Sequence, residues 1–203
     1  MSSILVNEDL FSDSPFFAQR HRLDELIDLF KFSERRILLG EGALANLGDE
    51  CQRLGTTRVL LVCDPGLDRL AAEVRGALGA TRIELVGEYN GVVRNPTVES
   101  VDACAGAIAG AGCDVVIALG GGSTLDTAKA AACVATTGAS IDAYWGFDLI
   151  PEPARYPVIA MPTTAGTGSE ASRVSVIADS EGKKAVYSDY LQPRVALVDP
   201  LLQ

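Results

Sequence analysis

Short apolar runs alternate with longer, helix-like segments along most of this chain. The runs at 58–63 (RVLLVC) and 114–119 (DVVIAL) are continuous rather than alternating, which is typical of strands buried on both faces of a sheet. Further strands are expected at 37–39, 82–86, 157–161 and 194–198, and helices at 43–54, 67–78, 98–109 and 124–136. This order predicts an α/β fold: a Rossmann-like parallel sheet with helices on both faces.

The two ends of the chain depart from this alternation. Residues 173–178 and 183–187 flank the turn Asp-Ser-Glu-Gly at 179–182, which predicts a β-hairpin near the C-terminus. Near the N-terminus, residues 16–32 (FFAQRHRLDELIDLFKF) carry apolar residues at helical spacing. We therefore expect a helical N-terminal extension over 1–32 and an α/β domain over 33–203.

Composition and charge exclude several classes of protein. The 203 residues are 48% hydrophobic and 22% charged, a balance that fills a core and argues against disorder. A net charge of −10 argues against a nucleic-acid or anionic-membrane surface. The best candidate for a membrane span, 101–119, carries Asp102 and Asp114, so no span is expected. The N-terminus has no basic n-region, so we expect a cytoplasmic protein.

Cysteine and histidine content limits the metal chemistry. The five cysteines form no C-x-x-C pair, and we predict buried, reduced thiols. The single histidine, His21, excludes a zinc site of the usual kind, which needs several imidazoles or thiolates at ligand spacing. It also excludes a Ser-His-Asp triad in practice, because it lies in the N-terminal extension. We assign no metal ligand.

The sharpest candidate feature is the turn Gly120-Gly121-Gly122-Ser123 between the run at 114–119 and the next helix. Glycines let a backbone approach a ligand closely, and the free N–H groups of a helix start favour an anion. A phosphate or pyrophosphate is the natural occupant. The alternative is a tight turn in which Ser123 caps the helix and Asp126 closes a capping box.

Asp64 follows the apolar run that ends at Cys63, and Pro65-Gly66 then turns the chain. A carboxylate at the tip of an early strand is where a doubly wound fold binds the ribose 2′-hydroxyl of an adenosine. It would repel a 2′-phosphate, which favours NAD over NADP. The alternative is an ordinary exposed aspartate in a turn before proline.

The segment 162–170 (PTTAGTGSE) follows the predicted strand at 157–161 and places Thr163 and Thr164 at its carboxyl end. Hydroxyls and glycines there suit the ligand crevice of such a sheet. The alternative is that Thr167 or Ser169 caps a helix with Glu170 in its first turn.

Two further residues are ambiguous. Asn95, before Pro96, is either a hydrogen-bonding group in the crevice or part of a plain turn. Lys184 is either a solvated hairpin lysine or a contact for a ribose hydroxyl or a carboxylate. The chain lacks a G-x-G-x-x-G after its first strand and any G-x-x-x-x-G-K-[ST], which weakens the standard Rossmann and P-loop interpretations.

Taken together, these motifs resemble the iron-dependent (group III) alcohol dehydrogenase family. The coupled motifs G-G-G-S-x-x-D-x-A-K at 120–129 and P-T-T-A-G-T-G-S-E at 162–170 are specific to it. The resemblance covers the chain from about residue 33 to its end, through the stretches 40–55, 58–67, 91–97, 112–130, 157–172 and 194–202.

The resemblance implies roles for particular residues. Asp64 matches the acid that selects the cofactor, and Gly121, Gly122 and Ser123 match the pyrophosphate-binding loop, with Asp126 beside it. Thr163 and Thr164 match a pair that lines the dinucleotide cleft. Asn95 and Lys184 match positions on its ribose side.

The resemblance also implies a second, all-helical domain that holds the catalytic metal through an Asp and three His. In the family this domain begins shortly after a D-P-x-L segment, here 199–202, and this sequence ends at Gln203. We therefore expect the all-helical metal domain to be absent from this chain, with Fe or Zn only in that missing part.

The function expected from the resemblance is the cofactor-binding half of a metal- and NAD(P)-dependent alcohol dehydrogenase, inactive alone. Such an enzyme transfers a hydride between an alcohol or aldehyde and nicotinamide. The expected partners are a nicotinamide dinucleotide, a small alcohol or aldehyde in the complete enzyme, and further copies of the same chain. The alternative is a non-catalytic nucleotide-binding or assembly module.

Overall fold

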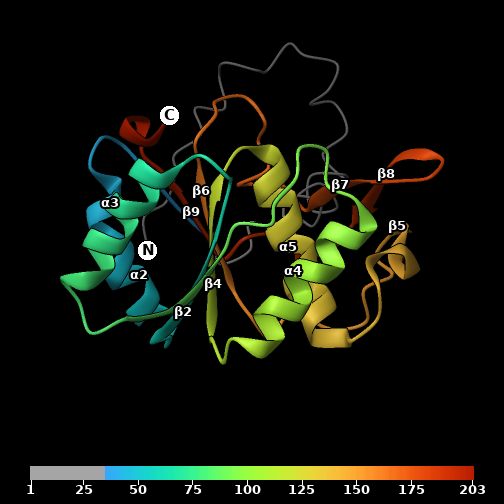
Figure 1. The fold of residues 1–203 in the computed structure, drawn as a ribbon, viewed down its shortest axis with the longest axis horizontal. Helices are drawn as coiled ribbons and strands as arrows, with labels where there is room; N and C mark the ends of the chain where they lie inside the picture. Colours follow the sequence, from blue (N-terminus) through green and yellow to red (C-terminus); the bar gives the residue numbers. More distant parts are fainter. Residues whose placement is uncertain (1–34) are drawn as a thin grey trace, which may run out of the picture. The chain divides into compact units, whose positions relative to one another are not determined.

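The computed structural model describes residues 35–203, and their main element is a six-stranded, fully parallel sheet (Figure 1). Its strand order is β1-β9-β6-β4-β2-β3. The strands are β1 (Arg36–Leu39), β2 (Arg58–Cys63), β3 (Glu84–Tyr89), β4 (Val115–Gly120), β6 (Val158–Pro162) and β9 (Val195–Val198). The predicted Rossmann-like parallel sheet is confirmed.

Helices cover both faces of this sheet. The helices are α2 (Leu47–Arg53), α3 (Asp68–Gly79), α4 (Val98–Gly110) and α5 (Gly122–Thr137). Short 3-10 helices are η3 (Ala43–Asn46), η4 (Ile141–Tyr144), η5 (Asp189–Leu191) and η6 (Pro200–Leu202). The helices α2 and α3 pack on one face, and α4 and α5 pack on the other.

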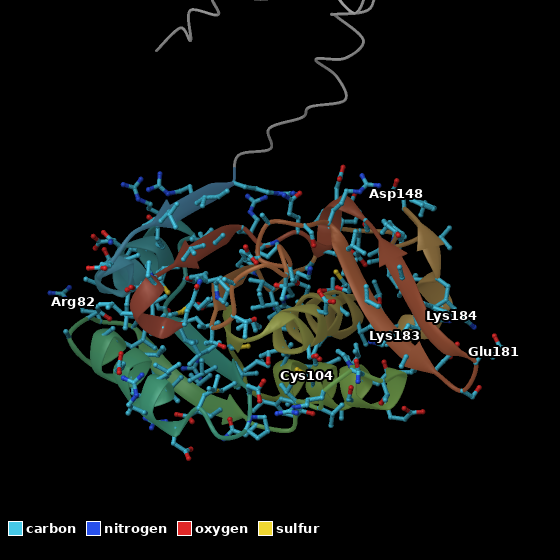
Figure 2. The ribbon with its side chains drawn as sticks, turned by 90° about the horizontal axis from the view of Figure 1, so that it is seen from above. Arg82, Cys104, Asp148, Glu181, Lys183 and Lys184 are labelled. Carbon is cyan, nitrogen blue, oxygen red and sulfur yellow. The ribbon has the colours of Figure 1, made fainter. Side chains whose placement is uncertain are left out.

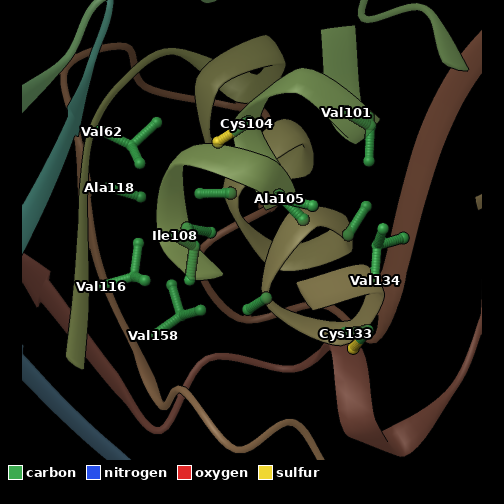
Figure 3. Close-up of a cluster of buried hydrophobic side chains, with 14 of the residues drawn as sticks. Val62, Val101, Cys104, Ala105, Ile108, Val116, Ala118, Cys133, Val134 and Val158 are labelled. Atoms are coloured by element: carbon green, nitrogen blue, oxygen red, sulfur yellow. The ribbon is translucent and has the colours of Figure 1, made fainter. Parts of the chain in front are cut away.

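The alternation of side chains along each strand explains the two cores. Val62, Val116 and Ala118 point to the face covered by α4, where they meet Ile108 (Figure 3). The residues between them, such as Ile117, point to the opposite face, under α2 and α3. A strand with helices on both sides must be apolar at every position, which is why the strand sequences read as continuous apolar runs.

The connections out of β2 and β4 run in opposite directions. The chain passes from β2 outward to β3, then returns to place β4 on the other side of β2. The helices that follow, α3 and α5, therefore lie on opposite faces of the sheet. In an open α/β sheet, such a switch point leaves a crevice outside the carboxyl ends of the strands, where ligands bind.

The predicted hairpin is present as the antiparallel pair β7 (Val174–Asp179) and β8 (Gly182–Tyr187). It forms a separate three-stranded sheet with β5 (Gly146–Phe147), which runs parallel to β8. The sequence did not predict β5, because a two-residue strand has no readable alternation. The ring of Phe147 stacks on that of Tyr187 with centroids 4.3 Å apart.

Some predicted bounds differ from those observed. The helix expected over 43–54 is divided into η3 and α2, and the strand expected over 82–86 begins later, at Glu84. The later start follows from a turn in which the Thr81 hydroxyl donates to the carbonyl of Leu78 and accepts from the N–H of Ile83. The helix expected over 16–32 lies outside the described residues.

All five cysteines are buried free thiols, as predicted. Within residues 35–203, no helix is both long enough and apolar enough to cross a bilayer.

Candidate functional site

The turn between β4 and α5 leaves the start of the helix open. β4 ends at Gly120, and Gly121 occupies the N-cap position without any side-chain cap. Ser123 instead accepts a hydrogen bond from the backbone N–H of Asn95, at 3.3 Å. The carboxylate of Asp126 bonds to partners outside the turn, described below. The capping-box alternative is therefore wrong, and the N–H groups of the first helical turn remain available to an anion.

The loop 163–172, called the threonine loop below because it carries Thr163, Thr164 and Thr167, packs directly against this turn. A Cβ added to Gly121 would lie 3.4 Å from Oγ1 of Thr164, and one added to Gly122 would lie 3.2 Å from Cγ2 of Thr167. At Gly122 the absence of a side chain is what allows the loop to approach this closely, whereas the approach at Gly121 would leave room for an ordinary contact. The structure thus brings Gly121, Gly122 and Thr164 together, although their motifs lie about forty residues apart.

The loop 163–172 contains no helix, so the interpretation of Thr167 or Ser169 as a helix cap is wrong. The loop begins where the N–H of Thr163 donates to the carbonyl of Gly120 at 3.0 Å, which extends the β4–β6 pairing. Thr163 therefore lies beside the glycine turn, at the carboxyl edge of the sheet.

Asp64 lies on the other side of the switch point. Its backbone N–H donates to the carbonyl of Leu119 at 3.1 Å, so it directly follows β2 at the same edge. Its carboxylate accepts a hydrogen bond from the hydroxyl of Thr124 in the first turn of α5, at 3.4 Å. Asp64 is partly exposed, and this contact places its carboxylate beside the first turn of α5.

Asn95 approaches the site from the loop before α4. It has a φ of 54°, a left-handed conformation that asparagine tolerates better than most residues. It lines a small cleft of about 120 Å³ with Ser123 and Asp126. The remaining lining residues are Pro96, Val176, Ala178 and Lys183.

Lys184 is not brought together with the other candidate residues. Its ammonium pairs with Asp179 at 2.6 Å and Glu181 at 2.7 Å, and these hydrogen bonds raise the pKa of Lys184. Figure 2 shows it on the hairpin, next to Lys183. Lys183 lines the cleft instead, because consecutive side chains of a strand point to opposite faces. Sequence reasoning missed Lys183.

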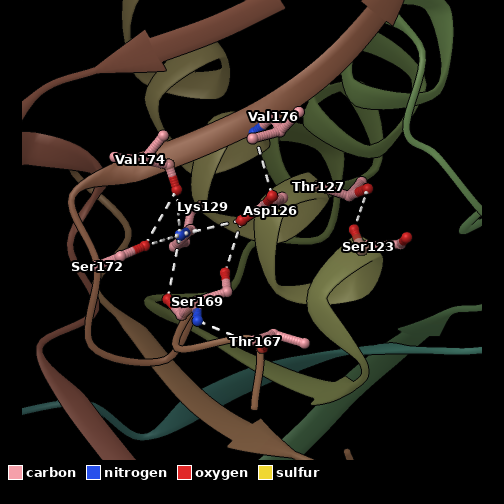
Figure 4. A network of polar contacts seen from close by, with 9 residues as sticks. All are labelled: Ser123, Asp126, Thr127, Lys129, Thr167, Ser169, Ser172, Val174 and Val176. Carbon is pink, nitrogen blue, oxygen red and sulfur yellow. Dashed lines mark hydrogen bonds and ion pairs between the residues drawn. The ribbon is translucent and has the colours of Figure 1, made fainter. Parts of the chain in front are cut away.

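The carboxylate of Asp126 links α5 to two other segments (Figure 4). Its Oδ1 accepts from the hydroxyl of Ser169 at 2.6 Å and pairs with the ammonium of Lys129 at 3.1 Å. Its Oδ2 accepts from the backbone N–H of Val176 at 3.0 Å. Asp126 thus borders the cleft while its oxygens are engaged within the protein.

Lys129 was not among the sequence candidates, and only 1% of its surface is exposed. Burial lowers the pKa of Lys129, and the neighbouring carboxylate of Asp126 opposes that shift. The available signal was a lysine in the alanine-rich run 128–132 of a helix next to the glycine turn.

Within residues 35–203, no three His, Cys, Asp or Glu side chains lie together as metal ligands would. Asp199, in the D-P-x-L segment, is 1% exposed, and its carboxylate accepts from the N–H groups of Gly42 and Leu44. It holds the turn after β1. His21 lies outside the described residues.

Comparisons with known proteins agree with this arrangement. A family model described as iron-containing alcohol dehydrogenase matches residues 34–200. The sulfoacetaldehyde reductase of Bilophila wadsworthia is 36% identical over 172 residues, which is 83% of this chain and 44% of that protein.

Solved structures show the same relationship. A 1,3-propanediol oxidoreductase aligns with a TM-score of 0.78 and 31% identity, over 83% of this chain and 44% of the other. A sulfoacetaldehyde reductase from Bifidobacterium kashiwanohense, solved in complex with NAD+, aligns with a TM-score of 0.73 and 34% identity, over 83% and 45%. The chain spans less than half the length of these relatives. On its sequence and its fold alike, the chain belongs to the iron-containing alcohol dehydrogenase family.

Proposed function

We propose that residues 33–203 bind NAD at the carboxyl edge of the sheet, as the cofactor-binding half of a metal- and NAD-dependent alcohol dehydrogenase. The observation that carries this proposal is the uncapped start of α5 at a glycine turn, with Asp64 on the neighbouring strand of the switch point. The relative solved with NAD+ supports the same cofactor class.

The glycine turn has the properties that a diphosphate requires. Gly121 and Gly122 present no side chains, and the helix that follows has 16 residues, long enough for a full dipole. The N–H groups of its first turn would donate to the diphosphate oxygens. Ser123, whose oxygen already accepts from Asn95, is free to donate its hydroxyl proton.

Asp64 would bind the hydroxyls of the adenosine ribose. Its carboxylate has a single hydrogen-bond donor among the described side chains, the hydroxyl of Thr124, and keeps acceptor capacity for a ribose diol. The same charge would repel the 2′-phosphate of NADP. This supports NAD as the preferred cofactor.

The nicotinamide end would then extend toward Thr163 and Thr164, on the loop that packs against Gly121. When bound, nicotinamide supplies the carbon that gives or takes the hydride. Thr163 and Thr164 would orient it, and Lys183 with Asn95 would form the polar wall of the adjoining cleft.

The described residues do not form a donor set for the catalytic iron or zinc that the family implies. We propose a small alcohol or aldehyde as the substrate of the complete enzyme only. On this basis residues 1–203 alone bind the cofactor weakly and do not oxidise alcohols.

Calorimetric titration of the full chain with NAD+, NADH and NADP+ tests the proposal. We expect weak binding of NAD+ and NADH, weaker binding of NADP+, and no alcohol oxidation. Absence of any binding at millimolar NADH would remove the proposal. If activity returns when the helical half of a relative is added, the chain is part of an enzyme; cofactor binding without such recovery favours the non-catalytic module.

We also propose that the chain forms homo-oligomers through the edge strand β1. Within residues 35–203, β1 pairs only with β9, and its side chains Ile37 and Leu39 are 64% and 76% exposed. An open parallel edge with exposed apolar side chains favours pairing with another chain. Light scattering of the wild type against the double variant Ile37→Lys, Leu39→Lys tests this, and an unchanged mass would contradict it.

A further inference from the structure

The ammonium of Lys129 lies in a pocket of oxygen atoms beneath the hairpin (Figure 4). It donates to the carbonyl of Ser169 at 3.1 Å, to the hydroxyl of Ser172 at 3.3 Å and to the carbonyl of Val174. It pairs with Oδ1 of Asp126 at 3.1 Å. Three of these four partners belong to one short segment, 169–174.

The energy of burial alone does not explain a charge in this position. Burying an ammonium carries a large desolvation penalty, and well-packed apolar residues often replace buried ion pairs without loss of stability. Burial does lower the pKa of Lys129, although Asp126 opposes it. Unlike an apolar side chain, the ammonium has several N–H donors, and these fix the positions of several carbonyl and hydroxyl oxygens at once.

Asp126 completes the attachment from the same helical turn. Its carboxylate accepts from the hydroxyl of Ser169, a residue that Lys129 also holds, and from the N–H of Val176, two residues beyond the segment. The bonds within the loop are short-range: Ala171 N–H donates to Gly168 and Ser172 N–H to Ser169. In addition, Ser169 N–H donates to the hydroxyl of Thr167, and the hydroxyl of Ser172 donates to the carbonyl of Val174. The side chain of Gln192 and the N–H of Ser188 also donate to the carbonyls of Ala171 and Arg173, but neither donor belongs to α5. The attachment of the loop to α5 therefore depends on the pair Asp126–Lys129.

This loop carries the residues that pack on the glycine turn. Thr164 lies against Gly121, and Thr167 lies against Gly122. Asp64, by contrast, is attached to β4 and α5 through Leu119 and Thr124, without any bond to the Lys129 network. Asp64 and the threonine loop are thus held by separate sets of contacts.

We infer that Lys129 is a positioning residue for the dinucleotide site: with Asp126, it fixes segment 169–174 on α5 and so sets the threonine loop at the nicotinamide end. The inference rests on the proposed function, since it assigns the nicotinamide to that end. It assigns no contact between Lys129 and the ligand.

The first test is hydrogen–deuterium exchange of the full chain and needs no ligand. Lys129→Met should speed exchange at least tenfold in 163–176 and leave β2 and α3 unchanged. Val74→Ala, in the fully buried core on the other face of the sheet, is the control for general destabilisation. Unchanged exchange in 163–176, or the same pattern in Val74→Ala, would overturn the inference.

The second test separates the two ends of the ligand. Lys129→Met should weaken binding of NADH at least tenfold and binding of ADP-ribose, which lacks nicotinamide, less than threefold. Equal losses for both probes would show a merely structural role and overturn the inference. If Lys129→Met does not fold, Ser172→Ala removes one oxygen partner and should give the same pattern, with smaller changes.

The results distinguish a failure of the proposed function from a failure of the inference about Lys129. If the wild-type chain binds neither NADH nor ADP-ribose, the proposed function is wrong, and the exchange experiment still decides whether Lys129 fixes the loop. If the wild type binds both and Lys129→Met changes neither, the proposed function stands and the inference falls.

Discussion

The hydroxyl of Thr124 donates to the carboxylate of Asp64 at 3.4 Å and joins the first turn of α5 to the end of β2. These two elements flank the point where the chain reverses its direction across the sheet. The contact therefore fixes a negative charge beside an uncapped helix start. In the proposed site, the helix start would attract the diphosphate of either cofactor. The carboxylate of Asp64 would repel the 2′-phosphate of NADP, and this difference would select NAD.

Asp64→Asn should relax the discrimination against NADP. The substitution removes the charge but keeps an oxygen to accept from Thr124, so the local structure should persist. We expect the affinity for NADPH relative to NADH to rise roughly tenfold, which corresponds to about 1.4 kcal/mol. Fluorescence titration with both cofactors measures the ratio. Asp49→Asn, an exposed aspartate of α2, is the control, and an unchanged ratio in Asp64→Asn would make Asp64 an ordinary turn residue.

Gly121→Ala should separate binding from folding. An added Cβ at this position meets nothing closer than Oγ1 of Thr164, at 3.4 Å, which is ordinary contact. The fold should therefore survive, while the added methyl group crowds the backbone turn that would bind the diphosphate. We expect NADH affinity to fall at least tenfold with the melting temperature nearly unchanged. Equal affinity in the variant would reduce the glycine turn to a packing device.

Gly122 is a poorer choice for the same experiment. Its added Cβ would lie 3.2 Å from Cγ2 of Thr167, so a larger residue there displaces the threonine loop as well. A loss of binding in Gly122→Val would then have two causes.

The sequence predicted those parts of the fold in which the pattern of apolar residues along a segment matches the burial of that segment in the folded protein. β2 was predicted over its full range because a strand covered on both faces is apolar throughout. The glycine turn, Asp64 and Thr163 were each predicted to follow a strand, and they lie at one edge because parallel strands end together.

The sequence could not resolve features that depend on register and packing between distant segments. Lys183 and Lys184 are equivalent in sequence, and only the register of β8 decides that Lys183 faces the cleft. Lys129 is likewise a polar residue in an alanine-rich helix until the oxygens of 169–174 are brought over it. Propensity and periodicity carry no information on such contacts.

Gly106→Ala should stabilise the protein. Gly106 is exposed in the middle of α4, and an added Cβ meets nothing within 4 Å. Alanine restricts the unfolded chain, so we expect a gain of about 0.5–1 kcal/mol in the free energy of unfolding. Gly48→Ala in α2 is the matched contrast, because its Cβ would collide with the side chain of Thr81. Urea unfolding measures both, and a destabilised Gly106→Ala would contradict the expectation.

The buried thiols predict how stability changes at alkaline pH. Burial raises the pKa of Cys104 and Cys133 to about 12, and that of Cys51 and Cys63 to about 11, from an ordinary value of 9.0. The unfolded chain therefore loses these protons first. The contribution to stability is complete below pH 9 and is lost progressively as the pH rises toward 11 or 12.

At pH 10, each such thiol should lower the free energy of unfolding by about 1 kcal/mol relative to pH 8. Urea midpoints measured from pH 7.5 to 10.5 follow this loss. Cys104→Ala should lower stability at every pH because it leaves a cavity, yet its stability should fall less steeply above pH 9. Lys129, whose pKa is lowered, has the opposite slope, but it is common to both proteins and cancels in the comparison. Identical slopes in the wild type and Cys104→Ala would show that this thiol ionises as readily in the folded chain as in the unfolded one.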